Sequence, residues 1–117
     1  MPVAQNSYTL LTNTALSTGD NLLQDNGAIT PGPDGRLPTT LFVFVRAHTL
    51  VTGPLTIRVE YSLDGTNWGG GDPAQTMTAI SVAGMAAKAF TIQYPRFRIV
   101  ANLTAGSGTM SLGMATA

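Results

Sequence analysis

Alternation of apolar and polar side chains is the pattern that most restricts how this chain can fold. In residues 56–63, TIRVEYSL, every second side chain is apolar: Ile57, Val59, Tyr61 and Leu63. A period of two residues is typical of a half-buried β-strand and does not suit an amphipathic helix. The sequence therefore predicts a strand here, with one face in a core and the other in water.

Strand signals of this kind recur along the chain, whereas no segment has a convincing helical period. They fall in residues 7–16, 40–48, 56–63, 76–82, 90–94, 97–103 and 108–116. Residues 82–90, VAGMAAKAF, come nearest to a helix, but Gly84 and the strand pattern that follows predict a single turn or none. Regularly spaced short strands predict an all-β fold: an antiparallel β-sandwich or jelly-roll-like barrel of about seven strands. On this pattern Tyr61, Phe90, Tyr94 and Phe97 all belong to the core.

The segment Leu41–Val45 differs because it is apolar on both faces. Such a run suits a central strand that is covered on both sides, or a strand whose second face is covered by another chain. At an exposed edge the same run would promote aggregation.

Length and charge restrict the class of protein. A chain of 117 residues predicts one domain, residues 1–117. Charged residues make up 10% of it and its net charge is zero, whereas charged side chains are usually spread over the surface of a soluble monomer. A charge-poor surface favours assembly, since interface centres are depleted in charge. With a single lysine, Lys88, the chain has no basic cluster for nucleic acid.

The sequence gives no support to a disulfide-stabilised protein or to a membrane protein. The chain has no cysteine, which excludes a disulfide framework and a thiolate metal site. Its longest apolar run, Leu41–Val45, is far shorter than the roughly 20 residues that cross a bilayer, so no membrane partner is expected. The N-terminal residues MPVAQNSYTL show no signal-peptide pattern. We expect synthesis in the cytoplasm, followed by assembly there.

Residues 17–38 do not fit a compact sandwich, because they hold four glycines and three prolines and show no sustained period. Long loops are often functional or disordered. This one is predicted to be either a surface connection or an arm that lies on a neighbouring molecule, and residues 1–6 could act as a second arm. The candidate contact residues are Leu22, Leu23, Ile29, Pro31, Arg36 and, outside the loop, Trp68.

Few residues look suited to catalysis. His48 is the single histidine, and a solvated or hydrogen-bonded role is expected for it. Four carboxylates, those of Asp20, Asp34, Asp64 and Asp72, neighbour glycine or proline, where Asp commonly bonds its own backbone. Calcium-loop, phosphate-loop and nucleophile-elbow spacings are absent from the sequence. We therefore expect no catalytic residue, no metal, no cofactor and no enzymatic activity.

The stretch EYSLDGTNW, residues 60–68, is the one place where a carboxylate and the single tryptophan stand together. Asp64 and Gly65 suit a tight hairpin, in which Asp64 bonds the backbone beyond it and Gly65 takes a positive φ. Trp68 is expected either to close the end of the core or to face a partner.

Two motifs resemble the small β-sandwich modules of tailed-phage virion proteins. The first is a strand that ends in Ser-x-Asp-Gly-x-x-Trp, and the second is a Tyr-x-Arg-Φ-Arg-Φ strand, Φ being apolar, followed by a glycine-rich hairpin. The matching residues are Ser62, Asp64, Gly65 and Trp68, then Tyr94, Arg96, Phe97, Arg98 and Ile99, then Gly106 and Gly108. The match covers about half of the chain, residues 56–115, and its motifs are structural.

A free-standing, charge-poor module of this type looks like a capsid decoration or cement protein. The resemblance implies a virion protein that binds the outside of an assembled phage head as a homo-oligomer, most often a trimer, with the major capsid protein as its partner. The rival interpretation is a receptor-binding or fibre-tip module that recognises host glycans through Trp68 and neighbouring polar residues.

Overall fold

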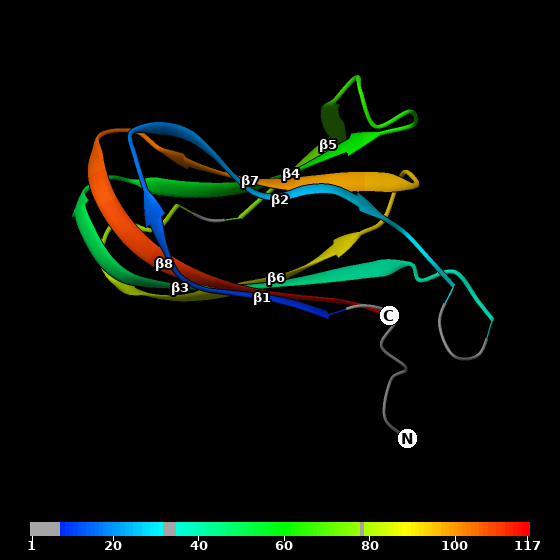
Figure 1. The fold of residues 1–117 in the computed structure, drawn as a ribbon, viewed down its shortest axis with the longest axis horizontal. Helices are drawn as coiled ribbons and strands as arrows, with labels where there is room; N and C mark the ends of the chain where they lie inside the picture. Colours follow the sequence, from blue (N-terminus) through cyan, green and yellow to red (C-terminus); the bar gives the residue numbers. More distant parts are fainter. Residues whose placement is uncertain (1–7, 32–34, 78) are drawn as a thin grey trace.

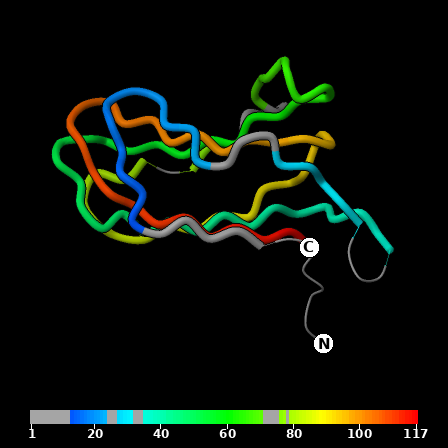
Figure 2. The backbone as a smooth tube through the Cα atoms, viewed as in Figure 1, coloured from blue at the N-terminus to red at the C-terminus, as the bar shows by residue number. Residues whose placement is uncertain are grey.

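The computed structural model describes residues 8–31, 35–77 and 79–117, with the side chains of 8–12, 24–26 and 71–75 left aside (Figure 2). Extended strands make up most of this part of the chain. They are β1 (Tyr8–Leu16), β2 (Gly19–Ala28), β3 (Thr40–Thr52), β4 (Leu55–Ser62), β5 (Gly69–Thr76), β6 (Gly84–Thr91), β7 (Arg96–Leu103) and β8 (Gly106–Thr116). The described residues contain no helix that could span a membrane.

The strands form two four-stranded antiparallel sheets that face each other (Figure 1). Sheet A has the order β1-β8-β3-β6, and sheet B has the order β2-β7-β4-β5. Eight strands divided in this way between two packed sheets form a jelly-roll sandwich. The predicted fold class is confirmed, with eight strands in place of about seven.

The core fills the space between the two sheets, and alternation decides which side chains enter it. Ile57, Val59 and Tyr61 of β4 point inward, as their spacing predicts. The other fully buried large side chains come from the central strands of both sheets: Leu41, Val43, Val45, Leu55, Phe97, Ile99, Leu103, Met110 and Leu112. Phe90 is buried as well. Two sheets with apolar inner faces bury one continuous core between them.

Two residues that the alternation assigns to the core lie outside it. Leu63 is 72% exposed because β4 ends at Ser62, so Leu63 falls in the turn that follows and no longer obeys the strand period. Tyr94 is 40% exposed because β6 ends at Thr91 and Tyr94 lies in the turn before Pro95. The prediction of a core role was wrong for both residues.

The predicted long loop, residues 17–38, was wrong over ten of its 22 residues. Residues Gly19–Ala28 form β2, which pairs with β7 from Gly19 opposite Leu103 to Ala28 opposite Arg96. Two register shifts interrupt this ladder, so the side chains lose the alternation by which a strand is recognised. Residues 32–34 of the connection to β3, and the predicted arm at residues 1–6, lie outside the described residues.

Two other segments also differ from expectation. The described residues of 76–82 contribute no strand beyond Thr76. They contact β4 through a bridge between Ile80 and Leu55 and through the N–H of Met77, which donates to the Ile57 carbonyl over 2.8 Å. Residues 84–91 form the edge strand β6, which begins six residues before the strand predicted at 90–94, and the expectation of a single helical turn or none is confirmed. β6 is rich in alanine, so its sequence carries neither a clear strand period nor a clear helical one, and pairing with β3 decides its conformation.

Candidate functional site

The hairpin between β4 and β5 contains the carboxylate that the sequence singles out. The backbone N–H groups of Thr66 and Asn67 donate to Asp64 Oδ1 over 2.8 and 2.9 Å, and Asn67 Nδ2 donates to Asp64 Oδ2 over 2.8 Å. Ser62 Oγ donates to Asp64 Oδ1 over 2.9 Å and accepts from the N–H of Gly65. Gly65 has a φ of 78°. The predicted roles of Asp64 and Gly65 as turn formers are confirmed.

These bonds also set the charge state of the turn. The N–H groups of Asn67 and Thr66, with the Asn67 amide and the Ser62 hydroxyl, hold the pKa of the Asp64 carboxyl well below its usual range. A carboxylate that accepts several hydrogen bonds is stabilised in its charged form. Both oxygens of Asp64 already have partners within the turn, so the carboxylate serves the hairpin.

Trp68 lies at the end of the same hairpin, half-buried, and belongs to the outer side of sheet B. The guanidinium carbon of Arg98 lies 4.8 Å from the centroid of the indole ring. This distance is that of a cation–π contact. Arg98 covers one face of the ring, and Trp68 is not among the residues of the core.

An ion-pair network extends from Arg98 across the outer face of sheet B. Arg98 Nε donates to Glu60 Oε1 over 2.6 Å, and Arg58 Nε donates to Glu60 Oε2 over 3.2 Å. Arg58 also binds both carboxylate oxygens of Asp20 over 3.1 and 2.9 Å. The network joins β2, β4 and β7 into one side-chain layer.

The same contacts shift the pKa values of the network. Hydrogen bonds from Arg58 and then from Asn102 lower the pKa of Asp20 to about 2. The pKa of Arg58 is raised, mainly by its bond to Asp20. Charge-assisted hydrogen bonds of this kind are strong and link the strands that carry them. The ion pairs therefore give the network a structural role.

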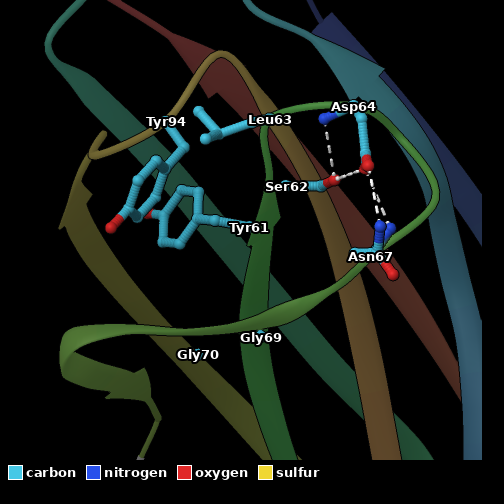
Figure 3. Close-up of a pocket in the computed structure, with 8 residues that line it drawn as sticks. All are labelled: Tyr61, Ser62, Leu63, Asp64, Asn67, Gly69, Gly70 and Tyr94. Atoms are coloured by element: carbon cyan, nitrogen blue, oxygen red, sulfur yellow. Dashed lines mark hydrogen bonds between the residues drawn. The ribbon is translucent and has the colours of Figure 1, made fainter.

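A hollow of about 290 Å³ lies beside the hairpin, with an aromatic and a polar side. Figure 3 shows the rings of Tyr61 and Tyr94 together near Leu63, and Ser62, Asp64 and Asn67 on the other side of the strand. The two rings are tilted by 52° with centroids 5.8 Å apart. Tyr61 OH donates to the Thr91 carbonyl over 3.0 Å, and burial raises the pKa of Tyr61 to about 12.

Tyr94 also borders a second, more apolar hollow of about 260 Å³, whose lining includes Ile29, Leu37 and Pro95. Leu37 is 64% exposed. Leu37, Tyr94 and Leu63 therefore belong to one continuous surface, which we call the apolar end of the sandwich. It lies where β2, β4 and β6 finish and β3 and β7 begin, on the right in Figure 1.

The predicted contact residues do not gather at one place. Ile29 lines the apolar end, with Pro31 and Arg36 exposed in the connection that follows β2. Leu22 is about half exposed on β2, whereas Leu23 packs against the core. Trp68 lies under Arg98. Leu37 lies in the predicted loop but was not named as a contact residue. Leu63 and Tyr94 were assigned to the core, and the exact ends of β4 and β6 would have placed them on the surface.

His48 is held by a neighbour, as expected. Its Nε2 lies 2.7 Å from Ser111 Oγ, which also accepts from the N–H of Asn13 over 3.2 Å. Within the described ranges, no three His, Asp or Glu side chains lie close enough together to hold a metal ion.

Comparison with known proteins identifies the fold. The PBSX exported protein XepA superposes on this chain with a TM-score of 0.61 at 17% identity, over 98% of this chain and 39% of XepA. The chain shares the fold of part of XepA. It spans about two fifths of that protein's length.

Other similarities are weaker. Eiger TNF from S. frugiperda has a TM-score of 0.49 at 11% identity, over 98% of this chain and 94% of that chain. The Bacillus endospore appendage protein has a TM-score of 0.42 at 17% identity, over 99% and 95%. No protein-family model matches the chain, and no curated protein sequence does.

Proposed function

We propose that the chain is a structural virion protein, a capsid decoration or cement protein that binds the outside of an assembled phage head. The observation that carries this proposal is the apolar end. Leu37, Leu63 and Tyr94 are exposed there on a chain of zero net charge. Large apolar side chains grouped on a charge-poor surface suit a contact with another protein.

The proposed action is physical. The apolar end docks on the major capsid protein, and a homo-oligomer, with a trimer as the expected number, reaches several capsid subunits at once. Linked docking sites raise the effective concentration of each further contact and slow release. The shell is stabilised because protein surface is buried across subunit boundaries, and no cofactor takes part. The fold shared with an exported protein of the prophage PBSX supports an origin among phage proteins.

The location is tested by cryo-electron microscopy of phage particles that carry the protein, compared with particles from which its gene has been deleted. We expect extra density that repeats over the outer surface of the head. Density confined to the tail tip would contradict decoration.

The docking surface is tested by sedimentation of the purified protein with heads that lack it. Leu37→Lys and Tyr94→Lys each place a charge in the contact and should weaken binding about 30-fold or more. Val82→Lys is the matched control, because Val82 is an apolar residue that is even more exposed than Leu37 and Tyr94 but precedes β6 at the opposite end of the sandwich. If all three variants bind like the original chain, the apolar end is not the contact.

Glycan recognition is the second candidate, and the hollow beside Tyr94 favours it. An exposed tyrosine next to the polar groups of Asp64 and Asn67 could receive a sugar. Decoration predicts that binding to heads survives Trp68→Ala. Glycan recognition predicts binding to a sugar array that is lost on Tyr94→Ala or Trp68→Ala, with no affinity for isolated heads.

A further inference from the structure

The outer face of sheet A carries two exposed phenylalanines in its middle. Phe42 and Phe44 of β3 are 44% and 46% exposed, while Leu41, Val43 and Val45 between and beside them are buried. The strands on either side place small residues next to the rings. We call this surface the phenylalanine face: Phe42, Phe44, Ala87, Ala89 and Gly113.

The phenylalanine face combines a ridge with a trough. Phe42 lies opposite Ala89 of β6 and Ala115 of β8, and Phe44 lies opposite Ala87 and Gly113. The small residues of β6 leave an open hollow of about 360 Å³ against the two rings. A cavity of about 150 Å³ already holds a benzene molecule, so this hollow has room for a phenylalanine ring from outside.

We propose that a second copy of this chain packs on the phenylalanine face. The same surface supplies both a ridge and a trough that can receive one, and self-complementarity of this kind is what a two-fold contact between identical subunits requires. A two-fold contact joins copies in pairs, so this inference replaces the trimer of the proposed function with a dimer or an assembly of dimers, and it rests on that proposed assembly.

Charge on this face is consistent with a second copy. Two exposed cations of β3 and β6 lie near the rings. Arg46 lies at the rim, opposite Met85 and Ser111, and Lys88 borders the hollow but its Nζ donates to the Thr76 carbonyl. An antiparallel arrangement of two copies places the two Arg46 side chains at opposite ends of the contact, where they do not repel. A highly charged partner would find no complementary charges on this face.

The area is also sufficient. Over the eight residue pairs that join β3 to β6, the four strands of sheet A cover about 27 by 19 Å at ordinary strand spacing. Two such faces bury on the order of 1,000 Å², the size that separates specific interfaces from incidental contacts.

Edge-to-edge pairing of two copies through β6, the edge strand beside the phenylalanine face, is disfavoured. Lys88 points to the inner side of this edge strand, where its Nζ donates to the Thr76 carbonyl over 2.8 Å and lies 5.3 Å from the Phe90 ring centroid. An inward-pointing lysine protects an edge strand from further pairing. Two β6 strands paired about their middle would also bring two Lys88 side chains together.

The test is the native mass of the purified chain, measured by light scattering after gel filtration. We expect a multiple of the 12.2 kDa chain mass, and for Phe44→Lys a dissociation constant raised about 30-fold or more. Val51→Lys is the control, because Val51 is an exposed apolar residue of the same strand beyond the end of the β6 pairing. It should keep the original mass.

A second variant keeps the test independent of folding defects. Ala87→Arg fills the trough from an exposed position of an edge strand, so the fold should persist while the oligomer dissociates. A monomeric original chain at about 100 μM, or an oligomer that survives both folded variants, would overturn the inference. If a monomer binds phage heads, this interface is rejected and the proposed function stands. If an oligomer forms through this face but does not bind heads, the interface stands and the proposed function is rejected.

Discussion

Gly106, the first residue of β8, is held where no side chain fits. Its φ is 87°, and a Cβ built on it would lie 1.7 Å from the carbonyl oxygen of Val51. Gly106→Ala should therefore lower the free energy of unfolding by about 2 kcal/mol or more. Gly69→Ala is the control, because a Cβ there meets nothing within 4 Å, and a change below about 0.5 kcal/mol is expected. Urea unfolding of both variants measures the difference, and equal losses would contradict the close approach.

The carboxylates of Asp20 and Asp64 make stability depend on acid. Both have a folded-state pKa below the unfolded value of about 3.9, and that of Asp20 is about 2. Their contribution is fully present above about pH 4 and is lost as the pH falls toward about 2. The melting temperature, measured by circular dichroism from pH 7 to pH 2, should decrease as the pH falls from about 4 to about 2.

Asp64→Asn separates the turn from the rest of this acid response. The amide that replaces the carboxylate has no charge to lose, so the variant should melt lower than the original chain at pH 7 and fall less steeply below pH 4. Parallel melting curves for the two proteins would show that the hairpin carboxylate has no part in the pH dependence.

The sequence predicted the roles of residues whose contacts are with near neighbours in the chain. Asp64 and Gly65 form their turn through hydrogen bonds between residues no more than five positions apart, so the Asp-Gly pair is enough to predict the turn. Trp68 was left undecided because its position depends on Arg98, thirty residues away on another strand. Tyr94 was misplaced because the end of β6 depends on its pairing with β3.

Among the strands, β4 gives the sharpest test of the alternation. Ile57 is fully buried and its neighbour Thr56 lies on the outer face. Ile57→Ala should cost about 3 kcal/mol of unfolding free energy, and Thr56→Ala less than about 1 kcal/mol. Denaturant titrations of the two variants supply the comparison. Similar losses would mean that the face assignment of β4 is wrong.

Strands with regular alternation were predictable, and β2 and β6 were not. β4, β7 and β8 each bury every second side chain over most of their length. The ladder of β2 shifts register after Leu22 and again after Gln24, which erases its period. Three of the eight residues of β6 are alanine, which has little preference for a strand, so its partner β3 determines its conformation.

At the scale of the molecule, the two outer faces differ in chemistry. Sheet B carries the ion pairs of Asp20, Arg58, Glu60 and Arg98, and sheet A carries the phenylalanine face. Salt screens exposed ion pairs but leaves apolar contacts intact. The native mass of the purified chain should therefore stay constant between about 0.05 and 1 M NaCl. Dissociation at high salt would point to a contact through sheet B.

The sandwich itself was predictable as a class, but its strand order was not. The alternation of apolar and polar residues predicts that each strand has a buried face, but it does not predict which strands are neighbours in a sheet. The pairing of β1 with β8 joins residues about a hundred positions apart. Such a long-range pairing depends on the packing of the whole core, and the sequence of neither strand predicts it.

The place of β8 in sheet A has a consequence for the timing of assembly. β8 lies between β1 and β3, so a growing chain cannot complete this sheet until residues 106–116 have left the ribosome. At synthesis rates of about 5–20 residues per second, all four strands of sheet B emerge before β8 can join β1 to β3. The surface around Phe42 and Phe44 therefore takes its final shape only after β8 has emerged, because β8 supplies the residues that lie opposite both rings.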